Sequence, residues 1–382
     1  MDGTPRVLIL TASYGSGHNA VAAALEAALR AAGARTQVVD HFRQLVHPRF
    51  DRWTRRLYGA VVCRAPALWR FAYWLGDRMA ASSPFAFDAN QLGRRKLAQL
   101  LDAERPDCVA CTHPTPAGAL ASLRARGHPV PPFAVVFSDF AAHRQWVHPA
   151  ADIHYVPDAA TARGIVARGA PESSVVVTGI PVRAEFAEPR DRAAARESLG
   201  LDPERPVVLA MAGASGRVGR LAAVARVLGR LPVPLHAVIA AGTDAALAAR
   251  LRRMVAGDDR IRVVDYVDNI RTLMAAADVL VTKAGGVSLA EALAAELPIV
   301  CFGSVPGHEA RNERFVVECG AALAARSARE LELTLRAALG KPDVLARLRE
   351  GIRAVRRPHA AREVAQNLLR LAAGARATAS AA

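Results

Sequence analysis

The amino-acid sequence predicts an α/β protein made of two parallel-sheet halves. Short apolar runs alternate with helix-like stretches almost from end to end, which is typical of parallel strands joined by helices. A proline-containing segment, Pro181–Pro206, separates two such series and indicates a linker. With 382 residues, of which 52% are hydrophobic, the chain is long enough for two domains that each bury a core.

The predicted strands are short apolar runs in which valine is the commonest residue. In the first half they are Val7–Thr11, Thr36–Asp40, Asp107–Cys111, Phe133–Phe137, Ile153–Val156 and Val175–Thr178. In the second half they are Val207–Met211, Leu235–Ala240, Ile261–Val264, Val279–Thr282 and Ile299–Phe302. Two closing helices, Pro342–Arg356 and Pro358–Ala373, are expected to pack back across the domain boundary. The predicted domains are residues 1–185 and 186–357, followed by a helix with a flexible tail at 358–382.

One segment, Phe42–Lys96, breaks the alternation and holds three of the four tryptophans among many arginines. Its apolar part, Leu57–Leu75, is interrupted by Arg64, Pro66 and Arg70, whereas a membrane span needs roughly 20 largely uncharged residues. Arginines interleaved with aromatics instead predict a helix lying among lipid headgroups. The expected membrane-surface residues are Arg52, Trp53, Arg55, Arg56, Trp69, Arg70 and Trp74. The alternative is a helical insertion that packs on its own domain.

The charge balance is strongly basic, with a net charge of +15 and a pI near 10.7. Such a balance indicates an anionic partner, but nucleic acid, anionic lipid and phosphorylated substrates satisfy it equally. The five cysteines are few, odd in number and mostly inside apolar runs, as expected for reduced thiols, so Cys108-x-x-Cys111 is interpreted as part of a buried strand. No signal-like segment precedes the first strand, which predicts a cytoplasmic protein.

A glycine loop follows the first predicted strand and opens a helix. Gly15 and Gly17 allow close backbone approach to a ligand, and His18 and Asn19 lie at the mouth of the loop. The pattern from Gly15 to Ala20, with Asp40 at the end of the second strand, also fits a dinucleotide fingerprint. His18 at the ligand-binding edge of an α/β sheet favours a functional site over that alternative.

Two further strand ends carry polar side chains toward the edge where His18 is expected. They are Thr112-His113-Pro114 and Ser138-Asp139-Phe140. We interpret His113, Pro114 and Asp139 as pocket residues, with a strand-end hydrogen-bonding role as the alternative for each.

The second half contains its own nucleotide-type turn. Lys283 ends a strand, and Gly285 and Gly286 leave space for a ligand beside the backbone. A helix is expected to begin near Ser288, whose hydroxyl and neighbouring N–H groups suit a diphosphate. Glu291, one turn into that helix, is placed to reach ribose hydroxyls. The alternative is a purely structural turn in which Ser288 caps the helix.

Two more loops are expected at the same edge of the second sheet. One holds Pro306, Gly307, His308, Glu309 and Asn312, of which Glu309 and Asn312 are candidates for sugar hydroxyls. The other holds Gly213, Ser215 and Gly216, again before a helix, and suits phosphates. The sequence contains no Asp-x-Asp and no His/Cys/carboxylate cluster with metal spacing, so no metal or other cofactor is expected.

Taken in order along the chain, these motifs resemble one family. The carriers are Gly15-Ser16-Gly17-His18, Thr112-His113-Pro114, Ser138-Asp139-Phe140 with Trp146-Val147-His148-Pro149, Thr178-Gly179-Ile180-Pro181-Val182-Arg183, Lys283-Ala284-Gly285-Gly286 and Pro306-Gly307-His308-Glu309. The chain is similar to the monogalactosyldiacylglycerol synthase and processive diacylglycerol glucosyltransferase group, which is related to the glycosyltransferase that makes lipid II. It departs from many relatives at His308, where they carry Gln, and in the loop Ala212–Gly219, which is less glycine-rich than in some.

The resemblance implies a GT-B fold, with two Rossmann-like domains facing a cleft, the second binding UDP-sugar and the first a lipid acceptor. It implies transfer of galactose or glucose to diacylglycerol with inversion, at the cytoplasmic face of the cell membrane. His18 suits the general base because its pKa range lies near neutrality, and Asp139 is the second candidate. The alternatives are transfer of N-acetylglucosamine to a polyprenyl-linked peptidoglycan precursor, and a non-catalytic lipid- or nucleic-acid-binding protein. No nucleic-acid partner is expected, and the sequence leaves the oligomeric state open.

Overall fold

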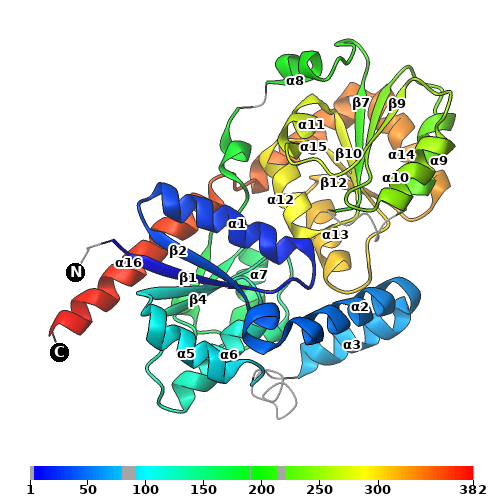
Figure 1. The fold of residues 1–382 in the computed structure, drawn as a ribbon. Helices are drawn as coiled ribbons and strands as arrows, with labels where there is room; N and C mark the ends of the chain where they lie inside the picture. The colour runs from blue at the N-terminus through cyan, green and yellow to red at the C-terminus, as the bar shows by residue number, and fades with distance from the viewer. Residues whose placement is uncertain (1–3, 80–90, 190, 214–219, 382) are drawn as a thin grey trace. The chain divides into compact units, whose positions relative to one another are not determined.

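The chain forms two compact units, each with one parallel sheet (Figure 1). The structure is a computed structural model that describes residues 4–79, 91–189, 191–213 and 220–381. Unit 1 comprises Met1–Ala184 and His359–Ala382, and unit 2 comprises Glu185–Pro358. Each sheet has six strands, so the predicted α/β fold with two parallel sheets is confirmed.

The sheet of unit 1 has the order β2-β1-β3-β4-β5-β6, with every neighbouring pair parallel. Its strands are β1 (Arg6–Thr11), β2 (Arg35–Asp40), β3 (Cys108–Cys111), β4 (Phe133–Val136), β5 (Ile153–Val156) and β6 (Val175–Val177). All six were predicted, with ends that differ by at most one residue. The chain runs from β1 outward to β2 and then returns to the other side of β1. Ligands of open α/β sheets bind at such a reversal, beyond the carboxyl ends of the strands, which here are the ends of β1 and β3.

Helices cover both faces of this sheet. They are α1 (Ser16–Ala31), the π-helix η1 (His41–Val46), α2 (Pro48–Arg64), α3 (Pro66–Arg78), α5 (Arg94–Glu104), α6 (Pro114–Ala125), α7 (Ala159–Val166) and α16 (Ala360–Ala381), with short 3₁₀ turns at Arg144–Trp146 and Glu172–Ser174. Helices α1 and α16 lie on one face, and α5 and α6 lie on the other (Figure 1). Leu8, Phe133 and Val135 from the strands pack on Leu97 of α5 and Leu120 of α6, forming a closed apolar core.

The sheet of unit 2 has the order β12-β11-β10-β7-β8-β9, also all parallel. Its strands are β7 (Val207–Met211), β8 (His236–Ala240), β9 (Ile261–Val264), β10 (Val279–Thr282), β11 (Ile299–Phe302) and β12 (Ala322–Ala325). The first five were predicted and β12 was not. Its Ala-Leu-Ala-Ala sequence lacks β-branched residues and has no strand signal, so the edge position beside β11 decides its conformation. The topological reversal lies between β7 and β10.

The helices of unit 2 enclose a second core. They are the 3₁₀ turn η4 (Ala184–Ala187), α8 (Arg192–Ser198), α9 (Leu221–Arg230), α10 (Ala245–Met254), α11 (Ile270–Ala276), α12 (Gly286–Ala294), α13 (His308–Glu318), α14 (Ala328–Gly340) and α15 (Pro342–Val355). Leu228 of α9, Leu251 of α10 and Leu335 of α14 are fully buried against Val208 and Val281 of the strands. The two closing helices were expected to behave alike, but α15 packs on α12 and α14 of unit 2, whereas α16 packs on α1 and β3 of unit 1.

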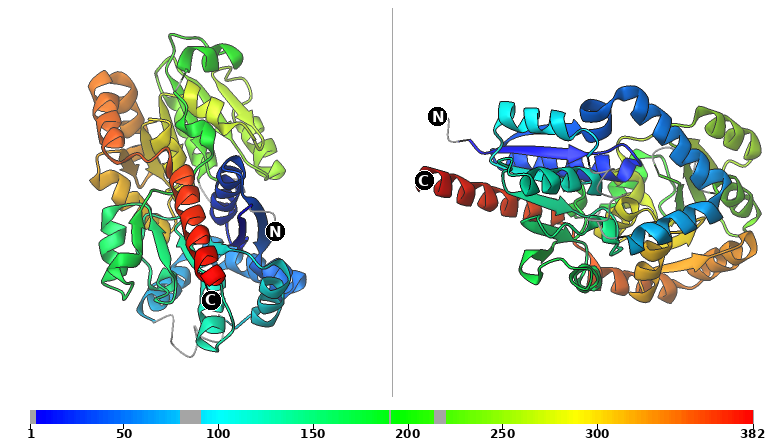
Figure 2. Two further views of the ribbon diagram at one scale, coloured as in Figure 1. Left: turned by 90° about the vertical axis from the view of Figure 1, so that its left-hand side faces the viewer. Right: turned by 90° about the horizontal axis from the view of Figure 1, so that it is seen from below.

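The basic aromatic segment forms two helices, α2 and α3, that pack side by side (Figures 1 and 2). Pro66 occupies the first turn of α3, where its missing N–H costs nothing, so the apolar stretch is divided at Ala65. Among the described residues, no helix combines the length and the apolar character that crossing a membrane requires.

A bidentate ion pair fastens the terminal helix to unit 1. The Arg376 guanidinium on α16 donates to both carboxylate oxygens of Asp107, at 2.7 and 2.6 Å, and also to the Thr4 carbonyl. Burial alone raises the pKa of Asp107, but hydrogen bonds from Arg376 and from the Arg6 N–H more than offset it, so the pKa is lowered. Because the pKa is lowered in the folded state, this carboxylate stabilises the fold above its unfolded pKa, and the stabilisation is lost as pH falls through the lower folded value.

Asp107→Asn is therefore expected to lower the melting temperature near pH 7 by a few degrees, because the variant cannot accept the charged bidentate contact. The difference from the unchanged chain should shrink as pH is lowered below about 4. Thermal unfolding followed by circular dichroism at several pH values measures it. Asp102→Asn is the control, because Asp102 is exposed and its ion pair with His128 is long, with 3.5 Å between the carboxylate oxygen and the ring nitrogen. An equal effect of both variants would refute the anchoring role.

Candidate functional site

The turn after β1 brings a histidine to the reversal point of the unit 1 sheet. Gly15 caps α1 with φ of +133°, a conformation that side-chain-bearing residues rarely adopt, so glycine is required there for backbone reasons. Asn19 links Thr11 to Ser13, with 3.0 Å between the polar atoms of each pair, and the Ser13 hydroxyl donates to Asp40. These bonds fix the turn at whose end His18 projects.

His18 is held in one orientation by the ends of two other strands. Its Nδ1 lies 2.8 Å from the carbonyl oxygen of Thr112, after β3, and 3.1 Å from the hydroxyl of Ser138, after β4. A carbonyl oxygen can only accept, so Nδ1 carries the proton and Nε2 is the basic nitrogen of the neutral ring. The Ser138 hydroxyl in turn donates to Asp139 across 3.3 Å. The predicted pair His18 and Asp139 is thus connected through Ser138, and no direct bond between the two is needed to orient the ring.

His113 lies beside His18, with ring centroids 4.8 Å apart in an edge-to-face arrangement. Burial lowers the pKa of His113 well below its ordinary value, and the nearby imidazoles of His18 and His41 lower it further. Its side chain also accepts from the Thr115 N–H and so caps α6, whose first residue is Pro114. His113 is therefore uncharged near neutrality, and it contributes shape and orientation rather than positive charge.

Asp40, which the dinucleotide alternative requires as a ribose ligand, is already engaged. One carboxylate oxygen accepts from the Arg43 N–H and caps η1, and the other accepts from Ser13. The Gln44 side chain accepts from the Asp40 N–H at 2.6 Å. This network supports the β1–α1 turn and weighs against a dinucleotide site there.

In unit 2, the turn after β10 leads directly into α12. The helix begins at Gly286, with Gly285 as the N-cap and no side-chain cap, so Ser288 stands inside the first turn. The helix thus begins two residues before Ser288, close to the expected position, and the Ser288 hydroxyl is not a cap. The N–H groups of Gly286, Val287 and Ser288 have no acceptor within an α-helix, and such groups form an anion site at a helix N-terminus. Glu291 is half-buried farther along the helix.

Two polar side chains of α13 contact the β10–α12 turn and stabilise it. Glu309 is 3% exposed, and its carboxylate pairs with Lys283 and accepts from the Val305 N–H at 2.8 Å. Asn312 is fully buried and donates to the Ala284 carbonyl at 3.0 Å. The sequence suggested sugar hydroxyls as partners of Glu309 and Asn312. In the structure Glu309 contacts Lys283 and the Val305 N–H, and Asn312 contacts the Ala284 carbonyl.

Two supporting residues were missed by the sequence analysis. The Ser304 hydroxyl accepts from the Ala284 N–H at 3.2 Å and donates to the carboxylate of Glu313 at 2.5 Å. With Asn312, these residues bind both the N–H and the carbonyl at Ala284 and fix the β10–α12 turn. The available signals were the position of Ser304 directly after a strand and the spacing of Glu313, one helical turn after Glu309.

The remaining donor-side candidates lie around the same turn. A Cβ on Gly213, which has φ of +72°, would lie 3.5 Å from Cε of Lys283, so the turn after β7 reaches the turn after β10. Pro306 and Gly307 lead into α13, Gly307 is its N-cap with φ of +105°, and His308 is its first residue. Ser215 and Gly216 lie outside the described residues. Among the described residues, no group of three or more His, Cys, Asp or Glu side chains is arranged to hold a metal ion.

Comparison with known proteins decides the family. Residues 18–182 match the family model of monogalactosyldiacylglycerol (MGDG) synthase, and residues 219–340 match that of group 1 glycosyl transferases. The chain is 30% identical over 367 residues to the processive diacylglycerol beta-glucosyltransferase of Bacillus mycoides (strain KBAB4), covering 96% of this chain and 93% of that one. The chain belongs to this glycosyltransferase family. A relative from Bacillus cereus (strain ATCC 10987 / NRS 248) is 30% identical over 366 residues, with the same coverage.

Solved structures confirm that this family member has a GT-B-type fold. MurG of Acinetobacter baumannii superimposes with a TM-score of 0.64 at 16% identity, covering 96% of this chain and 99% of that one. Anabaena Alr3699/HepE, solved in complex with UDP and glucose, gives a TM-score of 0.56 at 14% identity, covering 95% and 98%. At these identities the likeness concerns the fold alone. The resemblance drawn from the sequence motifs is confirmed by the family match, and the protein is a glycosyltransferase.

Proposed function

We propose that this glycosyltransferase moves a hexose from a UDP-sugar to the free hydroxyl of diacylglycerol, giving a β-glycosyl lipid with inversion at the anomeric carbon. The names of the relatives that match nearly the whole chain, and of the family model for unit 1, support this substrate pair. The observation that carries the proposal is the fixed imidazole of His18 at the reversal point of the unit 1 sheet.

The acceptor alcohol is a weak nucleophile, so a base must take its proton as the new bond forms. In the proposed step, the lipid oxygen attacks the anomeric carbon, its proton passes to Nε2 of His18, and the bond from the anomeric carbon to the diphosphate oxygen breaks as UDP leaves. Nδ1 is already committed to the Thr112 carbonyl, which favours Nε2 as the base. Asp139 acts through Ser138 as a positioning residue rather than as the base.

The leaving diphosphate gains negative charge, and the β10–α12 turn supplies positive potential for it. Three N–H groups in the first turn of α12 have no acceptor within the helix, and together with the helix dipole they can stabilise this charge; donors fixed in this way contribute several kcal/mol to catalysis. We propose that no divalent cation is required, a view supported by the absence of Asp-x-Asp from the sequence. Turnover is then expected to be unchanged after treatment with excess EDTA, and loss of activity that Mg²⁺ or Mn²⁺ restores would refute metal independence.

A donor panel tests the proposed function. The chain is incubated with diacylglycerol vesicles and with UDP-glucose, UDP-galactose or UDP-N-acetylglucosamine, and the lipid products are separated by chromatography. A β-hexosyl diacylglycerol from UDP-glucose or UDP-galactose is the expected product. Transfer only from UDP-N-acetylglucosamine, to a polyprenyl-linked precursor offered in parallel, would overturn the proposal in favour of the peptidoglycan reaction.

We also propose that α2 and α3 dock unit 1 on the cytoplasmic face of the membrane. An apolar stripe of Leu68, Phe71 and Leu75 follows one side of α3 at helical spacing, with each side chain at least 42% exposed. Trp74 is 45% exposed beside this stripe, with the Arg78 guanidinium 3.9 Å above its ring. Large exposed apolar residues next to arginines suit the boundary between acyl chains and phosphates.

The other predicted surface residues divide into two groups. Trp53 is 64% exposed on α2, and Arg52, Arg55, Arg56 and Arg70 are exposed as well. Trp69 differs from the expectation, because its ring packs edge-to-face on Tyr58 at 5.1 Å and its indole nitrogen is buried. Part of the segment thus serves as the helical insertion considered above, while the stripe on α3 remains exposed.

Replacing Phe71 and Trp74 with serine is expected to weaken binding to anionic vesicles by at least about tenfold, since burying one such side chain contributes about 1.5–3 kcal/mol. Vesicle sedimentation measures the binding. The matched control replaces Tyr266 and Leu333, which are 53% and 56% exposed on unit 2, with serine and should leave binding unchanged. Equal losses in both double variants would contradict docking through α3.

A further inference from the structure

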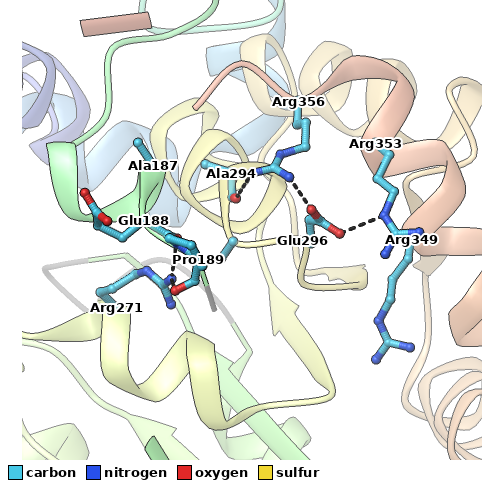
Figure 3. A pocket seen from close by; sticks show the side chains of 10 residues that line it. Ala187, Glu188, Pro189, Arg271, Ala294, Glu296, Arg349, Arg353 and Arg356 are labelled. Atoms are coloured by element: carbon cyan, nitrogen blue, oxygen red, sulfur yellow. Dashed lines mark hydrogen bonds and ion pairs between the residues drawn. The ribbon is translucent and has the colours of Figure 1, made fainter. Parts of the chain in front are cut away.

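Unit 2 contains a pocket lined by arginines, away from the turns assigned to the donor. It has a volume of about 500 Å³ and is lined by the C-terminal end of α12, by α15 and the residue after it, by Arg271 of α11 and by residues 187–189 (Figure 3). Helix α12 leads from the end of β10 to the start of β11, so this pocket lies at the amino end of the strands. The β10–α12 turn lies at their carboxyl end.

One of the four arginines is committed to the backbone. Arg271 is 9% exposed, and its guanidinium donates to the carbonyls of Glu185, Glu188 and Pro189 at 3.0–3.2 Å. This arginine fixes the wall formed by residues 187–189, and its hydrogen-bonding capacity toward the pocket is largely used. It therefore has a structural role.

The other three arginines come from one face of α15. Arg349 and Arg353 are four residues apart, and Arg356 follows the last residue of the helix. Side chains at such spacings lie on the same side of a helix, so their charges repel unless an anion separates them. Glu296 supplies one carboxylate: it accepts from Arg353 Nε at 2.8 Å and also pairs with Arg356 (Figure 3).

Glu296 does not pair with all three of these arginines. Figure 3 shows the Arg349 guanidinium pointing away from Glu296, and within the described chain no hydrogen bond or ion pair reaches it. Its other acidic neighbour, Asp278, already accepts from Arg192 and Arg196 at 2.7 Å each. Arg356 Nε is buried and lacks a hydrogen-bond partner among the described residues. Glu296 itself has φ of +51°, a costly conformation for a side-chain-bearing residue.

We propose that this pocket binds a phosphate group, held by Arg349, Arg353 and Arg356, and that Glu296 occupies part of the same site when the phosphate is absent. Planar guanidinium groups match phosphate oxygens in pairs. A doubly charged phosphate also neutralises more of the positive charge of the three arginines than one carboxylate does. Burial lowers the pKa of Arg349, and the nearby carboxylates of Asp278 and Glu296 do not fully offset this effect. The volume leaves room for an organic group attached to the phosphate. This inference does not depend on the proposed sugar transfer.

Calorimetric titration with inorganic phosphate, at constant ionic strength and with UDP in saturating amounts, tests the proposal. UDP is present because phosphate is also expected at the β10–α12 turn. Arg349→Gln should weaken binding by about tenfold, the usual effect of one charged hydrogen bond. Arg347→Gln, which alters an exposed arginine of α15 paired with Asp343, should leave the affinity unchanged. Glu296→Gln should tighten binding because it frees two arginines, whereas the control Glu350→Gln on the exposed side of α15 should not.

Two further arms identify the source of the phosphate. Glycerol 3-phosphate offers the group in soluble form, and vesicles of equal parts phosphatidylcholine and phosphatidylglycerol offer it on a lipid. The ligand class is the one whose binding is lost in Arg349→Gln but kept in Arg347→Gln. Arg353→Gln, at a side chain 62% exposed, provides a second variant if Arg349→Gln unfolds. Absence of saturable phosphate binding in the unchanged chain, equal losses in the Arg347 and Arg349 variants, or weaker binding in Glu296→Gln would overturn the proposal.

Discussion

His18→Ala is expected to lower kcat by about 10²–10⁴-fold, the usual contribution of a general base. The affinity for UDP should change little, because His18 belongs to unit 1, whereas the turns assigned to UDP belong to unit 2. Turnover is measured with UDP-glucose and diacylglycerol vesicles, and UDP binding is measured by calorimetry. A loss confined to kcat marks a residue that acts in the transition state.

The control for this prediction is His128→Ala. His128 lies between α6 and β4, at the amino end of the unit 1 strands, so it should leave kcat unchanged. Ser138→Ala should cause a smaller loss than His18→Ala, since the Thr112 carbonyl still holds Nδ1. If His18→Ala weakens UDP binding as much as it lowers kcat, His18 is a binding residue and the assignment as base is wrong.

The fold was predictable because its information is local. Eleven apolar runs are bounded by turn residues and separated by helix-like stretches, and such a series forms parallel sheets with few alternatives. Strand β12 was not predicted, because its Ala-Leu-Ala-Ala sequence has no strand preference of its own and pairing with β11 determines its conformation. Order along the chain also placed the glycine turns at the sheet reversals, after β1 in unit 1 and after β7 and β10 in unit 2.

The site was only partly predictable, for a physical reason. A residue that follows a strand can be assigned to the carboxyl edge of the sheet, which is how His18, His113 and Lys283 were found. Whether its side chain faces a ligand or a neighbouring turn depends on contacts between distant segments. Glu309 and Asn312 were assigned to sugar hydroxyls, yet they are buried and bond to Lys283, Val305 and Ala284. The partner that fixes the His18 ring is a backbone carbonyl, and residue types do not reveal which carbonyl will be in reach.

The Lys283–Glu309 pair yields the second large effect. Glu309 is 4% exposed in its side chain and Lys283 is 17% exposed, and removing one member of a buried pair typically costs about 3–5 kcal/mol. Lys283→Met keeps the length of the side chain but leaves the Glu309 carboxylate uncompensated next to the turn proposed to bind the diphosphate. We expect the affinity for UDP to fall by at least about tenfold, through repulsion of the diphosphate and displacement of the turn.

A double-variant cycle separates the two possible roles of the lysine. If Lys283 acts mainly by neutralising Glu309, then Glu309→Gln alone should retain UDP binding, and adding it to Lys283→Met should restore much of the lost affinity. The measurements are UDP affinity by calorimetry and melting temperature for the four proteins. We expect recovery, because the Glu309 carboxylate already receives the Lys283 ammonium and the Val305 N–H, and an amide at position 309 still accepts from that N–H. Failure of the double variant to recover would show that the ammonium of Lys283 contacts the diphosphate directly, and neutralising Glu309 would then not be the main role of the lysine in UDP binding.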